Sequence, residues 1–313
     1  MSGPRDPRLL VVALGGGALE AAGSPARPAE WLRCLGRTLP PLVDLIAAGF
    51  RLVVTHAGAP AVADLLGRPV PPAPPLSLDA CGAGSEGALG YAIAQVLDNL
   101  CRARGLETPV AAVATRVLVD GAEAASEGPG TPVGPAYAPA EARRLRREHG
   151  WTLVEEPGRG YRRLVPRARP RRVLETEALR RLVAAGVLPV VGAGGVPVVE
   201  TAVGYQGVEV RVEPDYTAAL LGTALTADRT LFLTGAERVM VGWGTPRAIA
   251  VERIAAREAR ALLAAGEFPR AGIGAKLEAA LEFVGAGGRE AVITSVAHAR
   301  AALDGRAGTR VVA

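Results

Sequence analysis

One residue of this sequence is unusual for its type: Lys276 is the single lysine among 36 lysines and arginines. It lies shortly after two glycines, Gly272 and Gly274. Lysine is a compact point charge on a flexible stem, whereas arginine is a wide planar fork. A cation that must touch phosphate oxygens in a narrow, glycine-lined space could require lysine and exclude arginine. The alternative interpretation is an ordinary surface lysine.

Three short apolar runs end in loops of small residues, at 15–17, 57–59 and 192–195. The carboxyl ends of strands form the ligand crevice of an open parallel sheet. Glycine there lets backbone N–H groups approach an anion, and a following helix adds positive potential. These loops predict a phosphate or carboxylate site. None matches the P-loop or the G-x-G-x-x-G dinucleotide fingerprint, so another architecture must hold any nucleotide.

The elements that position these loops follow from hydrophobic periodicity. Strands are predicted at 9–14, 52–55, 110–119, 188–191, 208–212, 231–234, 239–241, 291–295 and 309–312. Helices are predicted at 31–48, 85–104, 139–149, 175–185, 215–225, 246–265, 275–284 and 296–303. Alternating strands and helices indicate an α/β fold with a parallel sheet covered on both faces. Residues 120–172, rich in proline and glycine, interrupt the alternation and are interpreted as a protruding flap.

Composition excludes several classes of protein. The net charge is +5, but the arginine clusters at 143–147 and 162–172 lack interleaved aromatics and any nucleic-acid motif, so no nucleic-acid partner is expected. No apolar run reaches the ~20 residues of a membrane span. Three widely spaced cysteines and three isolated histidines provide neither a disulfide framework nor a metal site, which favours a cytoplasmic location.

Several motifs in one order then carry a resemblance. The matching segments are 11–19, 53–56, 79–87, 133–135, 158–166, 207–209, 233–234 and 274–280, together with Asp215. The most specific of them is 158–166, Gly-Arg-Gly-Tyr-Arg-Arg-Leu-Val-Pro, in the predicted flap. On these segments the chain resembles carbamate kinase, of the amino-acid kinase superfamily, essentially from end to end.

The resemblance implies a three-layer αβα sandwich with a mostly parallel sheet and a small flap. It implies an acid- and phosphoryl-binding N-terminal lobe at 1–190, containing the flap 120–172, and a nucleotide-binding C-terminal lobe at 191–313. The implied reaction is ATP + carbamate ⇌ ADP + carbamoyl phosphate with Mg²⁺, in a homodimer that acts in arginine metabolism.

The resemblance also implies roles for individual residues. Lys276 reaches the phosphates and Asp215 organises the site; the latter could equally be a helix N-cap. Arg159 of the flap is a further catalytic candidate, with Arg162 and Arg163 as alternatives. The expected substrate- and phosphoryl-binding residues are Gly15, Gly16, Gly17, Ala57, Gly58, Gly194 and Gly195. The expected nucleotide-binding residues are Thr234, Gly274 and Lys276, and no protein metal ligand is assigned.

This sequence departs from the family pattern at several positions. Gly17 replaces an asparagine and Ala57-Gly58-Ala59-Pro60 replaces Gly-Asn-Gly-Pro. Thr131 and Pro214 stand where the family has lysines, and Glu86 where glutamine is usual. Losing preorganised donors costs transition-state stabilisation. Two alternatives to carbamate kinase activity therefore remain: a kinase for another small acid, and a non-catalytic relative that binds nucleotide or an anion as a regulatory or partner subunit.

Overall fold

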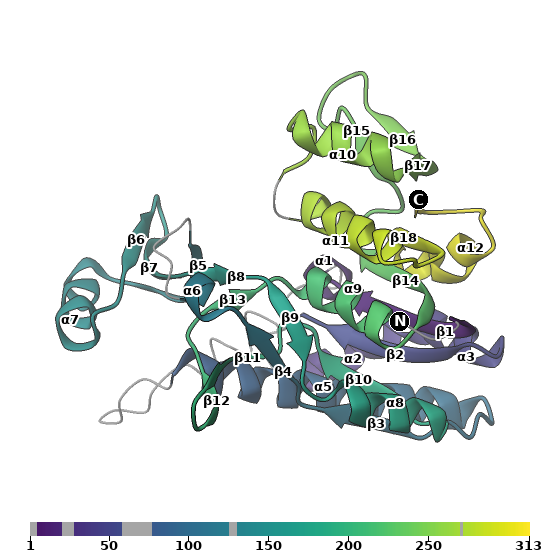
Figure 1. The fold of residues 1–313 in the computed structure, drawn as a ribbon, viewed down its shortest axis with the longest axis horizontal. Helices are drawn as coiled ribbons and strands as arrows, with labels where there is room; N and C mark the ends of the chain where they lie inside the picture. The colour runs from purple at the N-terminus through teal and green to yellow at the C-terminus, as the bar shows by residue number, and fades with distance from the viewer. Residues whose placement is uncertain (1–4, 21–27, 58–76, 125–129, 270–271) are drawn as a thin grey trace.

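The protein is described here from a computed structural model, which covers residues 5–20, 28–57, 77–124, 130–269 and 272–313. Its central sheet is built from β1 (Asp6–Leu14), β2 (Arg51–His56), β3 (Val110–Val113), β10 (Leu188–Gly192), β14 (Ala227–Thr234), β17 (Arg253–Ala255), β18 (Glu290–Ser295) and β19 (Thr309–Val312). The strand order is β17-β19-β18-β14-β1-β2-β10-β3, and every neighbouring pair is parallel except β18 with β19 (Figure 1). The predicted mostly parallel sheet is confirmed.

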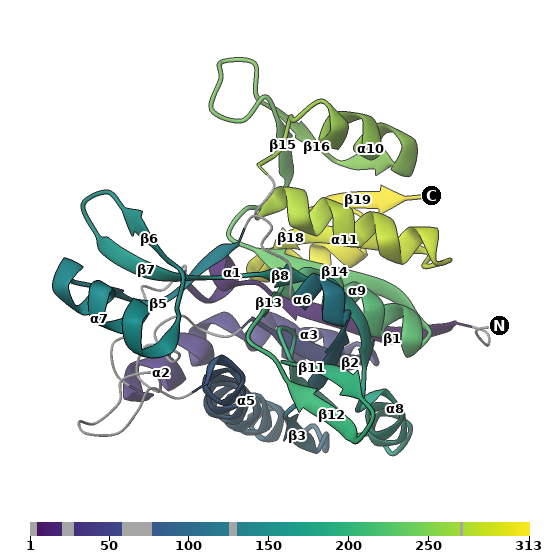
Figure 2. The same ribbon diagram turned by 60° about the vertical axis from the view of Figure 1, so that its left-hand side comes forward.

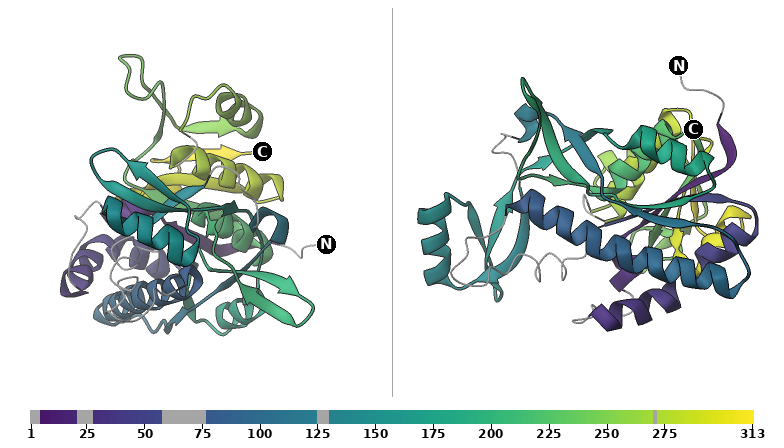
Figure 3. Two further views of the ribbon diagram at one scale, coloured as in Figure 1. Left: turned by 90° about the vertical axis from the view of Figure 1, so that its left-hand side faces the viewer. Right: turned by 90° about the horizontal axis from the view of Figure 1, so that it is seen from below.

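Helices cover both faces of this sheet, as the two views of Figure 3 show. One face carries α8 (Thr176–Ala184), α9 (Pro214–Ala224), α10 (Ala256–Ala264) and α11 (Ile273–Gly285). The other carries α2 (Pro28–Thr38), α3 (Pro40–Ala47), α5 (Leu78–Ala103) and α12 (Ala299–Leu303). The predicted three-layer αβα sandwich is thereby confirmed. Within the described ranges, no helix combines the length and apolarity that crossing a bilayer requires.

Strand β1 runs through the middle of the sheet and contributes to two separate cores. Leu9, Val11 and Ala13 pack in the cluster beneath α8 to α11. Their neighbours at 10, 12 and 14 pack in the cluster beneath α2, α3, α5 and α12. A strand buried on both faces must be apolar at every position, which explains the unbroken apolar run in the sequence. Burying each such side chain stabilises the fold by about 1.5–3 kcal/mol.

The flap is a small unit that extends away from the sandwich (Figure 2). It consists of β5 (Thr131–Tyr137), β6 (Leu153–Glu156) and β7 (Gly160–Val165), paired in the order β5-β7-β6, and of α7 (Pro139–His149). Ala142, Leu145 and Leu153 form a separate small core there. Arg163 attaches the flap to the sandwich, because its guanidinium stacks 4.2 Å from the Trp151 ring centroid and pairs with Glu209.

Shorter strands lie between the flap and the main sheet. A four-stranded sheet pairs β12 (Gly204–Gly207), β11 (Val196–Thr201), β4 (Arg116–Val119) and β9 (Pro170–Val173) in that order. A two-stranded parallel ladder joins β8 (Arg167–Ala168) to β13 (Arg211–Val212). The remaining elements are α1 (Gly16–Glu20), α6 (Gly121–Ala124), β15 (Val239–Val241), β16 (Ile249–Val251) and the 3₁₀ turn Val296–His298.

Several predicted elements were wrong in their extent or partners, among them the helix at 85–104, which begins at Leu78. The helix at 246–265 begins only at Ala256, because residues 249–251 pair with β15 as strand β16 in an antiparallel hairpin apart from the main sheet. The helix at 31–48 is divided, since Pro40 and Pro41 start a new helix. The predicted strand at 110–119 supplies two different sheets, and that at 208–212 is reduced to β13.

A core substitution tests this packing. Phe283 on α11 is fully buried, and its ring fills the space left by two glycines: a Cβ at Gly222 would lie 2.9 Å from the ring, and one at Gly288 2.3 Å. Phe283→Ala should lower the free energy of unfolding by about 3–5 kcal/mol in urea denaturation. Ile249→Ala, at a side chain that is 67% exposed, is the control and should change it by no more than about 0.5 kcal/mol. Equal effects would contradict the proposed packing.

Candidate phosphoryl-transfer site

The carboxyl ends of four adjacent strands meet at one edge of the sheet. Leu14 of β1 is in register with His56 of β2 and Leu233 of β14, and His56 with Gly192 of β10. Backbone bonds tie each following loop to its neighbour: the N–H groups of Gly15, Ala57 and Ala193 donate to the carbonyls of Leu233, Leu14 and His56 at 3.0, 3.2 and 2.8 Å. The described parts of the three glycine loops predicted from the sequence therefore lie at one edge.

Lys276 and Asp215 form a buried ion pair at this edge. The Lys276 Nζ donates to the two Asp215 carboxylate oxygens at 3.0 and 2.9 Å, and the residues are only 7% and 5% exposed. Burial raises the pKa of Asp215, and the charge of Lys276 opposes that rise. The helices α9 and α11 each contribute one partner from their first turns. Asp215 is not the N-cap of α9, which is Glu213.

The Lys276 ammonium lies in a narrow space beside a glycine, as predicted from the choice of lysine over arginine. A Cβ placed on Gly15 would lie 3.1 Å from the Nζ of Lys276 and 2.8 Å from the carbonyl oxygen of Leu233. Only glycine can approach the ammonium so closely at this position. The wider guanidinium of an arginine would need room that this contact does not leave. Lys276 is therefore a buried cation facing a glycine loop rather than an ordinary surface lysine.

The first glycine loop also lies beside the predicted nucleotide residue Thr234. A Cβ on Gly17 would be 3.5 Å from the N–H nitrogen of Gly235 and 3.8 Å from the Thr234 Oγ1. Gly16 begins the short helix α1 directly after Gly15. Residues predicted for the acid and for the nucleotide are thus brought together at the end of β14.

Gly274 has a packing role of its own. A Cβ there would collide with the carbonyl oxygen of Pro269 at 2.2 Å, so glycine lets the first turn of α11 pass close to the preceding loop. Gly272, the N-cap of this helix, has a φ of 72°, which favours glycine. Together they place Lys276 in the first turns of α11. A direct contact of Gly274 with nucleotide stays a prediction.

The third glycine loop is held by Glu86, which the sequence marked as a departure from the family's glutamine and not as one of the predicted binding residues. A Cβ on Gly192 would overlap the Glu86 carboxylate at 1.9–2.3 Å. The carboxylate accepts a bond from the Thr115 N–H at 3.3 Å and another from the Gly195 N–H. Burial raises the pKa of Glu86 to about 7. This α5 side chain links the segment at Thr115 to the third glycine loop. Its sequence signals were the family motif at 79–87 and the absence of a side chain at Gly192.

The other residues of the second and third loops are placed as follows. Gly195 has a φ of 61°, and a Cβ there would lie 2.1 Å from Val117 Cγ2, so both conformation and packing require glycine. A Cβ built on Gly194 would have no described neighbour within 4 Å, so packing does not require glycine there. Ala57 follows β2, and Gly58 lies outside the described residues. Burial lowers the pKa of the preceding His56 to about 4, which keeps its ring neutral at pH 7.

The structure does not bring the flap arginines to Lys276. Arg159 is 73% exposed at the β6–β7 turn, and its guanidinium lies 3.7 Å from the Glu156 carboxylate. Arg162 also contacts Glu156 and donates to the Gly134 carbonyl. Arg163 pairs with Glu209. The catalytic role assigned to Arg159 therefore stays a prediction.

The raised pKa of Glu86 gives a stability test. A carboxyl whose pKa rises on folding stabilises the fold when protonated, so its contribution is complete below the unfolded pKa of 4.5 and lost as pH rises through about 7. Glu86→Gln keeps the acceptor oxygen without the charge. Relative to wild type, it should be nearly neutral at pH 4.5 and more stable at pH 8 by on the order of 3 kcal/mol. Urea denaturation across this range measures the difference, and a pH-independent difference would contradict it.

Comparison with known proteins identifies the family. A family model described as "Amino acid kinase family" matches residues 8–295. Carbamate kinase of Pyrococcus horikoshii is 34% identical over 97% of this chain and 99% of its own length, and that of Thermococcus kodakarensis is 36% identical over 97% and 98%. The solved structure of carbamate kinase from Giardia lamblia bound to AMP-PNP superimposes with a TM-score of 0.92, at 29% identity, over 98% of each chain. The resemblance carried by the motifs is confirmed: the chain belongs to the amino acid kinase family, among the carbamate kinases.

Proposed function

We propose that this protein transfers a phosphoryl group between adenine nucleotide and carbamate, in the reaction ATP + carbamate ⇌ ADP + carbamoyl phosphate. The observation that carries the proposal is the buried Lys276–Asp215 pair, whose ammonium faces Gly15 where the strand ends meet. Phosphoryl transfer needs positioned cations and N–H donors rather than covalent chemistry by the protein. An ammonium held by a carboxylate beside a glycine loop is suited to that task.

The two halves of the chain would divide the substrates. We assign the acid and the transferring phosphoryl group to the loops of the N-terminal lobe, residues 1–190, with the flap at 120–172 above them. We assign the nucleotide to the C-terminal lobe, residues 191–313, which contributes Thr234, Gly274 and Lys276. The solved relative from Giardia lamblia is bound to AMP-PNP, which supports a nucleotide as one of the substrates. A reaction that uses adenine nucleotide and the reduced cysteines Cys34, Cys81 and Cys101 both suit the cytoplasm.

Magnesium would enter with the nucleotide. Among the described residues, no group of three or more His, Cys, Asp or Glu side chains is placed to hold a metal ion. Mg²⁺ usually takes one or two carboxylates together with substrate phosphates rather than an all-protein cage. Glu213, which immediately precedes α9, is the carboxylate best suited to complete such a shell, because Asp215 already binds Lys276. The bound ion would offset the negative charge of the phosphates.

Turnover tests the proposal. The wild-type protein should produce ATP from ADP, Mg²⁺ and carbamoyl phosphate, and Lys276→Ala should lower the rate by about 100-fold or more, because a preorganised donor is lost. Lys276→Arg should also lose activity, since Gly15 leaves too little room. ATP release is followed by a coupled luminescence assay.

The matched control separates catalysis from folding. Lys276→Ala leaves the Asp215 carboxylate buried and unpaired, which costs about 3–5 kcal/mol. The double variant Lys276→Met/Asp215→Asn removes both charges and should fold normally while remaining inactive. Nucleotide binding by wild type without turnover would instead favour the regulatory relative, and turnover only with another acid would favour a different acceptor.

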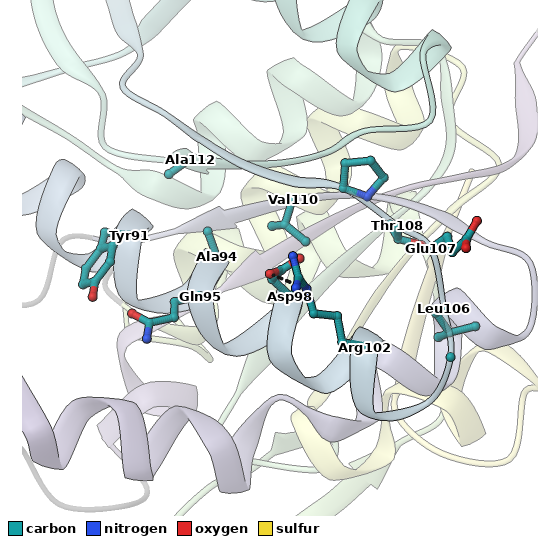
Figure 4. A pocket seen from close by; sticks show the side chains of 12 residues that line it. Tyr91, Ala94, Gln95, Asp98, Arg102, Leu106, Glu107, Thr108, Val110 and Ala112 are labelled. Atoms are coloured by element: carbon teal, nitrogen blue, oxygen red, sulfur yellow. Dashed lines mark ion pairs between the residues drawn. The ribbon is translucent and has the colours of Figure 1, made fainter.

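We propose further that the protein is a homodimer joined through the edge of its sheet. Strand β3 ends the eight-stranded sheet and none of its four residues is buried, whereas all five residues of neighbouring β10 are. A groove of about 890 Å³ lies beside it against α5, lined by side chains such as Tyr91, Ala94 and Val110 (Figure 4). Tyr91 is 61% exposed. A second copy would supply both a partner strand and an apolar cover.

Solution mass tests this interface. Sedimentation equilibrium should give twice the chain mass of 32.1 kDa for wild type. The variant Tyr91→Glu/Ala112→Arg places charges on α5 and β3 and should shift the mass to that of one chain. Trp243→Ala, which removes another exposed aromatic far along the chain, is the matched control and should stay dimeric. A monomeric wild type, or a dimeric double variant, would refute the interface.

A further inference from the structure

A second pocket, of about 540 Å³, is lined by sequence neighbours of Lys276 and Asp215 rather than by the pair itself. Ala275 and Glu278 line it from α11, on either side of Lys276 in the sequence. Glu213 and Tyr216 line it from α9, on either side of Asp215. Its opposite wall comes from the β8–β13 ladder, with Arg167 and Arg211 among the lining residues. The pocket therefore adjoins the proposed phosphoryl-transfer site from the side of the flap.

The charges at this place are unbalanced without the two arginines. Asp215 neutralises Lys276, because both of its carboxylate oxygens accept from the ammonium. Glu213 adds a further carboxyl, whose pKa is raised first by burial and next by Asp215, and lowered by Arg211, Lys276 and Arg167. A nucleotide polyphosphate would face net negative charge if Lys276 were the only cation. Arg167 and Arg211 add two positive charges on the wall of the pocket near Glu213.

The fold holds these two arginines side by side. They are directly paired in the parallel register of β8 and β13, so their side chains project from the same face of the ladder. The Arg167 Nε donates to the Thr131 Oγ1 at the start of β5. Neither guanidinium has an ion pair within 4 Å among the described residues. Both therefore retain donors for a ligand.

The neighbouring charged groups are already engaged. Arg169 in the same pocket pairs with Glu278 and Glu282 and lies 3.6 Å over the Tyr216 ring. Glu123 accepts from the Arg169 backbone N–H and lies 3.5 Å from Arg171. Each of these two arginines already contacts two carboxylates, so neither has a charge left over for a ligand. Arg167 and Arg211 are thus the uncommitted cations of the pocket.

We infer that Arg167 and Arg211 bind the phosphate groups of the nucleotide and supply the positive charge that the paired Lys276 lacks. A guanidinium presents several N–H donors in a planar fork that matches two phosphate oxygens at once. The inference rests on the proposed function for the identity of the ligand. Arg167 belongs to the arginine cluster at 162–172, whereas Arg211 was not singled out from the sequence.

Nucleotide titration of charge-removing variants tests the inference. Arg167→Gln and Arg211→Gln should each weaken ADP and ATP binding by about 10-fold or more, and the double variant by more than either, as expected for lost hydrogen bonds to a charged group. Adenosine binding should not change, because it carries no phosphate. Isothermal titration calorimetry with adenosine, AMP, ADP and ATP measures this, and the loss should grow with the number of phosphates.

Three controls make the outcome decisive. Arg171→Gln removes an exposed arginine that pairs with Asp120 and Glu123, and should bind ADP as wild type does. Arg167→Lys and Arg211→Lys keep a positive charge and should recover part of the lost affinity. Circular dichroism melting identifies any variant that fails to fold, and Arg167→Met or Arg211→Met then replaces it as the charge-removing variant. Unchanged ADP affinity in the folded charge-removing variants, or an equal loss for adenosine, would overturn the inference.

The turnover assay separates this inference from the proposed function. If wild type releases no ATP from carbamoyl phosphate but its ADP binding depends on Arg167 and Arg211, the reaction assignment fails and the phosphate site stands. If wild type turns over and the glutamine variants bind ADP normally, the phosphate site fails and the reaction assignment stands.

Discussion

The site depends on one constraint: an ammonium group removed from water must be paired. Lys276 lies in the first turns of α11 and Asp215 in the first turn of α9, so the ion pair holds the amino ends of both helices together at the edge of the sheet. Removing one partner of such a pair leaves a buried charge without compensation. Gly15 closes the other side of the ammonium. Gly15, Asp215 and Lys276 come from three distant parts of the chain. Together they set where the ammonium lies, how its charge is balanced and how closely other groups can approach it.

The same pair creates an electrostatic requirement that the surrounding residues meet. Because Asp215 cancels Lys276, the neighbourhood needs further cations before it attracts an anion with several charges. In a chain that uses arginine nearly everywhere, those cations are expected to be guanidinium groups. Arginine can serve at the rim, where Arg167 and Arg211 have the room of an open pocket. Arginine is too wide for the position that faces Gly15, and the chain has its single lysine there.

Much of the sandwich could be predicted from the sequence, because strands buried on both faces are recognisable as unbroken apolar runs, as in β1. Lys276 and Asp215 were found by residue type and family motif. What periodicity could not show were contacts decided by tertiary pairing. Residues 249–251 form a strand only because β15 lies opposite them. Glu86 reaches Gly192 across the sheet edge, and Arg211 meets Arg167 only through their ladder, and neither contact leaves a local pattern.

The loops at the strand ends are joined to one another by main-chain bonds from Gly15, Ala57 and Ala193. A backbone N–H is present in every residue except proline, so these bonds restrict residue type only where a Cβ would collide, as it would at Gly15. Gly17, Thr131 and Pro214 take no part in the three bonds, so the residue types at those positions leave this main-chain frame intact. The strand ends can therefore keep their arrangement while the polar and charged groups around them differ from one sequence to another.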